Sequence, residues 1–251
     1  MDRHNLKQKA MTRIISIITL FMISGNILMA QNEAESAQNK VNVSFNADLV
    51  SRYVWRGLLY SPNVNIQPTV GLTAGNFFAG AWASYGFSDK YAEVDFYAGY
   101  SFGNLTLTVN DYYNENEMAL TEADHFNWDS ETTTHALEGT LNYYFGERCP
   151  LTLKAATFFY GNDRDAAGEN YYSTYFEAMY NWQLNDGYQL SGFVGGTPAE
   201  GLYAADAALV NAGFSLGKTV AINNQISLPV EASLVSNPKA EDIFFVLKAT
   251  F

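Results

Sequence analysis

Apolar and polar residues alternate with a period of two from residue 41 to the end of the chain. Within 91–102, one face carries Val94, Phe96, Ala98, Tyr100 and Phe102, while the other carries polar or small residues. Successive side chains of a strand point to opposite faces, whereas a helix repeats every 3.6 residues. The pattern therefore predicts strands throughout this region and almost no helix.

About twelve such segments can be counted, and each is at least as long as the 9–11 residues that a tilted membrane-spanning strand needs. The expected strands are 41–57, 63–74, 77–87, 91–102, 105–113, 134–145, 151–160, 171–183, 188–197, 208–220, 225–235 and 242–251. Tight turns such as Gly75-Asn76 and Gly103-Asn104 alternate with long polar links at 114–133, 161–170, 198–207 and 236–241. This layout predicts an all-β fold: a closed antiparallel transmembrane β-barrel of about 12 strands, with short periplasmic turns and longer extracellular loops.

Alternation alone does not say which face of the sheet meets solvent or lipid. A soluble, lipocalin-like barrel would turn its apolar face inward, and it is the main structural alternative. Three features favour lipid on the outside. First, aromatic residues, which are enriched at membrane–water interfaces, lie at the ends of the apolar rows. They are Tyr53, Trp55, Tyr85, Phe87, Tyr143, Phe145, Tyr172 and Trp182. The opposite rows carry charges near mid-strand, which would be costly in lipid. The last strand ends on the apolar row Phe245, Leu247, Ala249 and Phe251, which resembles the C-terminal signal read by the outer-membrane assembly machinery.

Two prolines conflict with this pattern. Pro68 and Pro229 lie inside predicted strands, yet a closed barrel has no free edge that tolerates a missing N–H. We expect a bulge or a local break at each of them.

The N-terminal residues are typical of an export signal. Arg3, Lys7, Lys9 and Arg13 precede an uncharged, mostly apolar run, and Ala30 offers a small residue for cleavage. Met11 would serve equally well as the start. The expected organisation is a signal peptide at 1–30, a short periplasmic segment at 31–40 and an outer-membrane barrel at 41–251, in the cell outer membrane of a Gram-negative bacterium.

Charge and cysteine content narrow the choice of partners. Without residues 1–30 the chain has 10 basic and 25 acidic residues, a net charge of −15, which does not suit a nucleic-acid partner. Cys149 is the single cysteine, so no intrachain disulfide can form. The expected partners are outer-membrane lipid and the assembly machinery. No cofactor and no metal site are predicted.

Few residues suggest catalysis. After residue 30 the only histidines are His125 and His135, and neither lies in the His-x-Ser spacing of outer-membrane phospholipases. The link 114–133 holds six carboxylates and no lysine or arginine, so divalent cations would be able to bridge these carboxylates to each other or to lipopolysaccharide. The simpler interpretation of this link is a solvated external loop. The chain is therefore not expected to be an enzyme.

Strand parity places charged residues of both signs inside the barrel. The predicted pore-lining set is Asp48, Arg52, Arg56, Glu93, Asp95, Glu138, Lys154, Glu177, Glu231 and Lys248. Bulky residues are also expected inside, namely Tyr97, Tyr112, Tyr144, Phe158, Tyr160, Tyr175 and Phe244. The combination predicts a narrow or partly closed channel for small solutes, with a mild cation preference because acidic residues outnumber basic ones.

Three stretches together resemble the TorF-like family of porin-type outer-membrane proteins. They are Ser51–Gly57 (SRYVWRG), Ala79–Ser84 (AGAWAS) and Glu93–Tyr100 (EVDFYAGY). The resemblance implies an outer-membrane barrel with a transport role and no established substrate. It singles out Arg52, Arg56, Trp82, Glu93 and Asp95, either as solute-selecting residues or as inward ion pairs that set strand register.

Three functions stay open at this point. The first is a narrow, passive, porin-like channel. The second is a non-conducting structural or adhesion barrel with acidic external loops. The third is a membrane-embedded hydrolase that uses His125 or His135.

Overall fold

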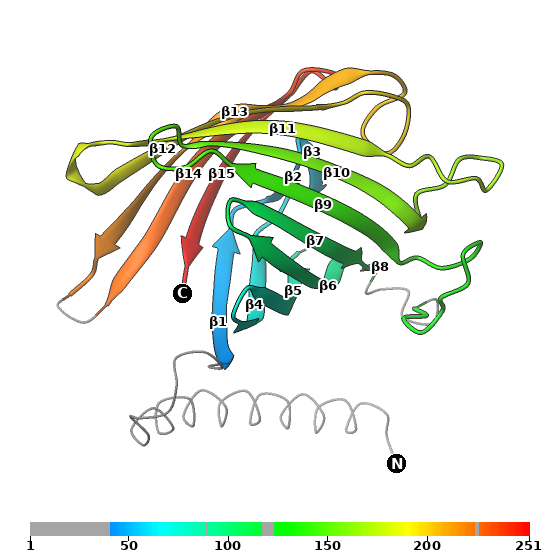
Figure 1. Ribbon diagram of the computed structural model, residues 1–251, viewed down its shortest axis with the longest axis horizontal. Coiled ribbons are helices and arrows are strands. Elements are labelled where there is room, and N and C mark those ends of the chain that lie inside the picture. The colour runs from blue at the N-terminus through cyan, green and yellow to red at the C-terminus, as the bar shows by residue number, and fades with distance from the viewer. Residues whose placement is uncertain (1–40, 89, 117–122, 224–225) are drawn as a thin grey trace, which may run out of the picture. The chain divides into compact units, whose positions relative to one another are not determined.

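The computed structural model describes residues 41–88, 90–116, 123–223 and 226–251 (Figure 1). The expected signal peptide at 1–30 and the segment 31–40 lie outside the described residues, as does part of the link 114–133. No helix in the described part of the chain has the length and hydrophobicity needed to cross a membrane.

The structure is built from strands and one short 3₁₀ turn, η1 (Asn185–Gly187). The strands are β1 (Val41–Val50), β2 (Tyr53–Trp55), β3 (Leu58–Ser61), β4 (Asn65–Ala74), β5 (Phe77–Gly86), β6 (Tyr91–Phe102), β7 (Leu105–Tyr112), β8 (Asn114–Asn116), β9 (Ala136–Tyr144), β10 (Leu151–Gly161), β11 (Thr174–Gln183), β12 (Tyr188–Thr197), β13 (Ala208–Ala221), β14 (Ser227–Asn237) and β15 (Asp242–Thr250).

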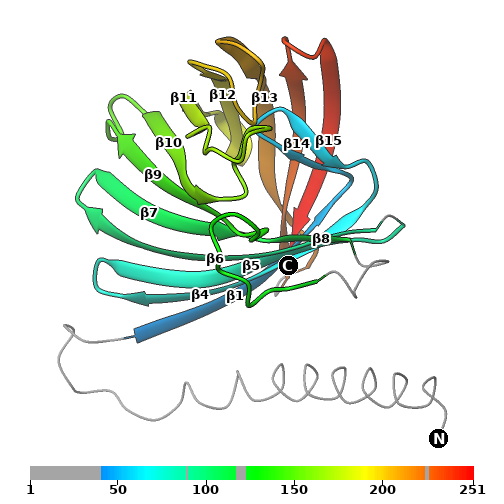
Figure 2. The same cartoon turned by 90° about the vertical axis from the view of Figure 1, so that its right-hand side faces the viewer.

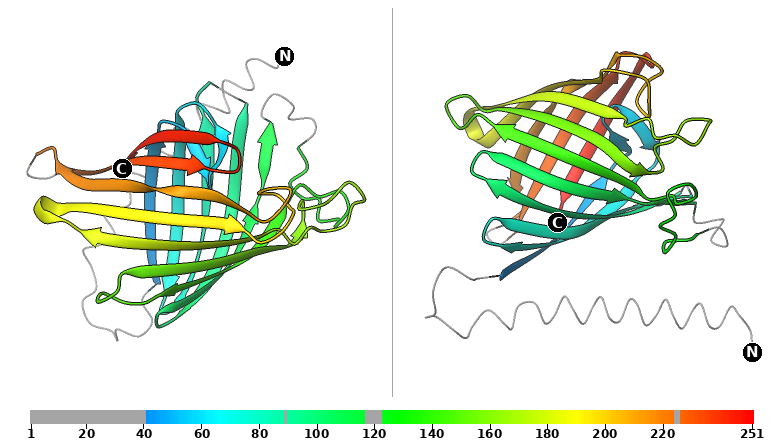
Figure 3. Two further views of the ribbon diagram at one scale, coloured as in Figure 1. Left: turned by 90° about the horizontal axis from the view of Figure 1, so that it is seen from above. Right: turned by 45° about the vertical axis from the view of Figure 1, so that its right-hand side comes forward.

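The long strands close into a ring (Figure 2). Each pairs antiparallel with its neighbour, and β15 returns to β1 through Asp48↔Thr250, Leu49↔Ala249 and Val50↔Lys248. Within the described residues this makes a closed, antiparallel barrel of 12 strands, as the sequence predicted. The strands run tilted across the wall (Figure 3). We call the end with the short turns 75–76, 103–104 and 185–187 the turn end, and the end with the links 51–64, 113–135, 162–173 and 198–207 the loop end.

Apolar rows face outward and polar rows face inward. On β1 the outward side chains Val43 and Phe45 are 71% and 65% exposed, and on β15 Ile243 is 68% exposed. The paired inward positions of β13 and β14 include Ser215 and Ser233, whose hydroxyls lie 2.8 Å apart. A soluble barrel would have buried the apolar rows instead, so this alternative does not describe the chain.

The two prolines are accommodated differently. Pairing between β4 and β5 stops at Ile66↔Tyr85 and resumes at Thr69↔Trp82 without a change of register, so Pro68 lies at a local break. Pro229 pairs with β13, but it lies just beyond the residues of β14 that pair with β15. A missing N–H therefore interrupts the ladder only at Pro68.

Two details differ from the expected strands. The first strand does not continue to residue 57, because β1 ends at Val50 and the chain then turns into the barrel. A register shift between Phe158 and Tyr160 on β10 pairs Tyr160 with Leu137 of the outward row, so Tyr160 does not face the lumen as parity predicted.

Candidate functional site

Between β1 and β4 the chain folds into the barrel as residues 51–64, which we call the inner hairpin. Among the described residues, its strands β2 and β3 form a separate two-stranded sheet, joined by the two-residue turn Arg56-Gly57. Both turn residues have positive φ, 50° for Arg56 and 79° for Gly57. This geometry matches the twist of a tight hairpin, but it disfavours a residue with a side chain such as arginine. Contacts elsewhere must therefore hold Arg56 in place.

The Arg56 guanidinium is held by a buried carboxylate on β9. Its Nη1 lies 2.5 Å from Glu138 Oε2, and its Nη2 donates to Glu138 Oε1 at 2.9 Å. Nη1 also donates to the hydroxyl of Tyr203 in the link between β12 and β13. The guanidinium carbon lies 4.3 Å from the ring centroid of Trp55 and 4.8 Å from that of Tyr175. A bidentate pair with aromatic faces on both sides is the arrangement in which a guanidinium is most strongly held.

Burial by itself lowers the pKa of Arg56, but hydrogen bonding to Glu138 and the electrostatic influence of Tyr203 and Glu138 raise it more. The net pKa lies above the ordinary value for arginine. Burial is also the main cause that raises the pKa of the Tyr203 hydroxyl. Arg56 therefore stays charged and Tyr203 stays neutral over the whole physiological pH range.

The turn of the inner hairpin also touches β14 and β13, which lie two and three strands from β1 in the ring. Asn237 of β14 donates its side-chain N–H to the Gly57 carbonyl oxygen at 3.2 Å. A Cβ added at Gly57 would lie 1.9 Å from the carbonyl oxygen of Val210 on β13. Since the hairpin leaves the wall between β1 and β4 and its turn reaches β9, β13 and β14, it crosses the lumen.

Replacing Gly57 with alanine is expected to displace the turn from this seat. The added methyl would collide with backbone atoms rather than with a side chain that can move. In addition, a non-glycine residue held at this positive φ is strained by about 1–3 kcal/mol. Gly75→Ala is the matched control, because Gly75 has a φ of 59° but nothing within 4 Å of the added Cβ. The temperature at which the folded barrel loses its fast mobility in gel electrophoresis should fall more for Gly57→Ala. Equal midpoints for the two variants would show that the turn is not tightly seated.

Aromatic rings fill the space around the inner hairpin. Trp55 lies with ring centroids 5.6 Å from Tyr112, 6.5 Å from Phe158 and 5.8 Å from Tyr203. Tyr53 lies 5.4 Å from Trp82. These contacts correct the expectation that Tyr53 and Trp55 sit at the lipid boundary. Both lie inside the barrel, because the strand that carried them in the prediction ends at Val50.

The structure places the other predicted pore-lining residues on inward strand positions. Lys154 and Glu177 are cross-strand partners with Nζ and Oε1 3.4 Å apart, and Lys248 and Glu231 are partners at 3.3 Å. Asp48 accepts a hydrogen bond from Thr250 at 2.5 Å. Cross-strand pairs of this kind help to set strand register. Whether these residues line a conducting path stays a prediction.

Three of the predicted residues have a different environment. Glu93 and Asp95 are adjacent inward positions of β6, only 3% and 7% exposed, and no ion pair of the described residues includes either of them. Arg52 lies in the bend after β1 rather than on a barrel strand, and its buried Nε has no hydrogen-bond partner in the structure. Strand parity predicted that Arg52 and Arg56 face the lumen. Neither residue lies on a barrel strand, so parity does not determine the direction of their side chains.

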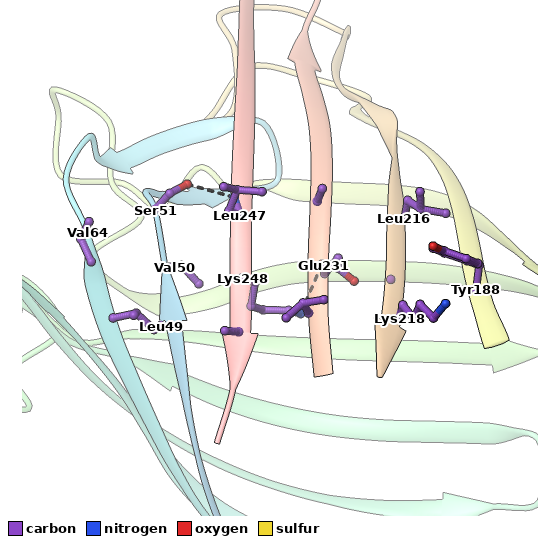
Figure 4. A pocket seen from close by; sticks show the side chains of 14 residues that line it. Leu49, Val50, Ser51, Val64, Tyr188, Leu216, Lys218, Glu231, Leu247 and Lys248 are labelled. Carbon is purple, nitrogen blue, oxygen red and sulfur yellow. Dashed lines mark hydrogen bonds and ion pairs between the residues drawn. The ribbon is translucent and has the colours of Figure 1, made fainter. Parts of the chain in front are cut away.

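The C-terminal residues follow the outward row of β15. Phe245, Leu247 and Phe251 are 55%, 50% and 70% exposed, and Ala249 lies on the same row. Leu247 and Ala249 border a shallow apolar groove of about 490 Å³ on the outer face, which Leu49 and Leu216 also line (Figure 4). Near its lower edge the ammonium of Lys218 lies 4.0 Å from the ring centroid of Tyr188. The role of the C-terminal row as an assembly signal stays a prediction.

His135 anchors the link between β8 and β9. Its Nδ1 lies 2.8 Å from Asp111 Oδ1, its Nε2 lies 2.8 Å from the His125 carbonyl oxygen, and its ring stacks on Trp128. Both ring nitrogens are thus occupied, and neither contacts a hydroxyl group that would act as a nucleophile. The described residues include no group of three or more histidine, cysteine or acidic side chains arranged to hold a metal ion.

The sequence did not predict the residues of the barrel that contact the turn of the inner hairpin. Tyr203, Val210 and Asn237 carry no motif, and their role follows only from contact with a turn far away along the chain. One signal was present in the predicted first strand. Gly57 is a turn-forming residue at the end of the predicted strand, and in the structure it lies in the turn of the inner hairpin, seven residues after the strand ends at Val50.

These features define a class of structure, a closed all-β barrel whose lumen is crossed near one end by an inward-folded hairpin. No protein-family model matches the chain, and no curated protein is similar to it. Among solved structures it matches the COG4313 outer membrane channel from Pseudomonas putida F1, with 14% sequence identity, a TM-score of 0.38, and coverage of 88% of this chain and 97% of that chain. A likeness at this level carries no inference about function. Membership of the TorF-like family stays a prediction.

Proposed function

We propose that this chain is an outer-membrane channel for small solutes, with a narrow lumen that the inner hairpin closes at rest. The observation that carries the proposal is the hairpin itself. It crosses a lumen with polar and charged walls, and a single ion pair, Arg56–Glu138, joins its turn to the opposite strand. The other contacts of the turn are hydrogen bonds with Asn237 and Tyr203 and side-chain packing, and an element held by such contacts rather than by a strand ladder is suited to move away from the wall.

The outer surface supports placement in a bilayer. Soluble proteins rarely expose contiguous apolar patches larger than a few hundred Å². Here the outward rows are mostly apolar, with Asp111 and Lys218 as charged exceptions near strand ends, and exposed aromatic residues end several rows, including Tyr85, Phe87, Tyr143, Phe145 and Trp182. By analogy with bacterial barrels, the turn end would face the periplasm and the loop end the outside.

The inward charges support a mild preference for cations. Glu93 and Asp95 are not compensated by an ion pair, whereas the inward lysines Lys154 and Lys248 each face a carboxylate. Among the described residues, the inward carboxyl groups without a basic partner therefore outnumber the inward basic groups without an acidic one, of which Arg52 is the example, and a low-dielectric wall strengthens the field of any charge that these carboxyl groups carry. The resemblance to TorF-like porins fits the same proposal.

Recording from planar lipid bilayers tests the proposal directly. Purified wild-type barrel in potassium chloride should show small, short-lived conductance steps, and a salt gradient should give a reversal potential of the sign expected for cations. A reversal potential of the opposite sign would contradict the cation preference. Complete silence of the wild type and of variants that release the inner hairpin would contradict a channel.

The packing of the inner hairpin also favours a second candidate, a non-conducting structural barrel. The buried cluster of Phe158, Tyr175, Tyr203 and Val210 packs against Trp55 and Leu58 like a small protein core. In that case the hairpin would stay fixed across the lumen. The same recordings separate the two candidates, because a fixed hairpin predicts that a variant that releases the turn lowers the stability of the barrel without producing conductance.

A further inference from the structure

A second feature of the lumen is a cavity of about 280 Å³ on the loop side of the inner hairpin. Its lining includes Trp55 and Tyr60 from the hairpin and Phe158 from β10, together with Asn114 and Leu202 from segments of the loop end. The hairpin therefore forms part of the cavity, and the links of the loop end border it. A ligand in this cavity would not have to cross the barrel to reach its site.

Aromatic rings form much of the cavity lining. Trp55, Tyr60, Tyr91, Tyr112 and Phe158 all line it. They also contact one another, with ring centroids 5.9 Å apart for Trp55 and Tyr60 and 5.8 Å apart for Tyr60 and Tyr91. Because each ring is packed against another, the lining is preorganised rather than assembled by the ligand.

Acidic side chains lie at the cavity. Glu93 lines it, is 3% exposed, and accepts a hydrogen bond from the hydroxyl of Tyr91. Asp95 follows as the next inward residue of β6, and neither carboxylate belongs to an ion pair among the described residues. Of the basic groups near the cavity, Arg56 is matched by the bidentate pair with Glu138, and Arg164 donates to the backbone carbonyl oxygens of Ser130, Gly161 and Thr133. A cation in the cavity would therefore lie beside carboxyl groups that no basic side chain of the described residues pairs with.

The lining also restricts the kind of cation. A metal ion needs several oxygen ligands at short range. The two carboxylate residues of the lining, Glu93 and Asp163, lie on different segments, and both oxygens of Asp163 already accept hydrogen bonds from Ser173. Aromatic rings that surround a positive centre, together with a nearby carboxylate, recognise alkylated ammonium groups. A neutral sugar would stack on the rings but would leave Glu93 without a counter-charge.

We propose that this cavity binds small organic ammonium ions, in which a positive nitrogen carries short hydrocarbon groups. The rings contact the hydrocarbon groups, and the Glu93 carboxylate lies beside the charge. The proposal rests on the proposed function only for the assignment of the loop end to the outside. Binding itself does not require that the channel conduct.

Calorimetric titration of the folded wild-type barrel in detergent tests the proposal. Tetramethylammonium should bind measurably more tightly than tert-butanol, a neutral molecule of similar shape, and more tightly than glucose. This comparison needs no variant, so it stands even if a substitution impairs folding. Equal binding of tetramethylammonium and tert-butanol, preferential binding of glucose, or no binding of tetramethylammonium would each overturn the proposal.

Substitution then locates the site. Glu93→Gln keeps the size of the side chain and removes its charge, and it should weaken tetramethylammonium binding by about tenfold or more. Glu231→Gln is the control, since Glu231 is an inward carboxylate that borders a different cavity, at the turn end. If both variants bind like the wild type, the cavity is not the site. If the wild-type barrel binds tetramethylammonium but shows no conductance, the proposed channel function fails and the binding proposal stands.

Discussion

Replacing Glu138 with alanine is expected to release the inner hairpin and to give the largest increase in conductance of any single substitution at this site. Glu138 is fully buried, and Arg56 is nearly so, with side chains 0% and 7% exposed. Removing one partner of a buried pair leaves an uncompensated charge, at a cost of about 3–5 kcal/mol. The guanidinium can escape this cost by moving toward water, and the hairpin would have to move with it. Planar bilayers should show larger or longer conductance steps than the wild type, and denaturant unfolding should begin earlier.

Two further variants make this result specific. Lys248→Ala removes one member of a half-exposed pair with Glu231, with both side chains 35% exposed, and pairs in such positions contribute little, about 0–1 kcal/mol. It should leave both the conductance and the unfolding midpoint close to the wild-type values. Exchange of the buried charges, Arg56→Glu together with Glu138→Arg, should restore part of the closed state. Conductance of Glu138→Ala identical to that of the wild type would mean that the hairpin does not gate the lumen.

The second large effect is expected from charge on the outer wall. Phe214 is an outward residue near the middle of β13 and is 54% exposed, whereas its neighbour Ser215 faces inward. An arginine that faces lipid at mid-strand costs about 2–4 kcal/mol, while lumen positions tolerate polar groups. Phe214→Arg should therefore sharply reduce the yield of folded barrel in phospholipid vesicles, and Ser215→Arg should reduce it much less.

The same pair of variants distinguishes a membrane protein from a soluble one. In water an exposed arginine is better solvated than an exposed phenylalanine, so a soluble barrel would tolerate Phe214→Arg at least as well as Ser215→Arg. The measurement is the fraction of protein that acquires the fast-migrating, unheated form on gel electrophoresis after refolding into vesicles. An equal or reversed ranking of the two variants would argue against a lipid-facing outer wall.

Much of the barrel could be read from the alternating pattern because the period of side chains along a strand is a local property. The segments 91–102 and 188–197 were predicted with the bounds that the structure shows, and most other strands agree within two or three residues. Inward and outward rows follow from the same parity, so Glu138, Lys154 and Glu177 were placed on the correct face. Parity failed at Tyr160 because one register shift on β10 reverses the direction of the next side chain.

The candidate site could not be obtained in this way. The run 51–57 alternates like the strand before it, so nothing local separates a longer strand from a hairpin that turns inward, apart from Gly57. The contacts that decide the outcome join Arg56 to Glu138, 82 positions away, and Gly57 to Asn237, 180 positions away. Partners so distant meet only after the barrel has closed. Their identity depends on which strands become neighbours across the lumen.

By itself, the sequence determined that this chain forms a closed antiparallel barrel of about twelve strands with an apolar exterior, because strand periodicity and turn spacing are encoded residue by residue. The tertiary structure alone decided that the lumen is crossed by the inner hairpin, with Arg56 paired to Glu138 and an aromatic cavity beside Glu93. The physical reason is that burial, pairing and cavity shape inside a barrel arise from residues brought together across it, and no local pattern records which of them will meet.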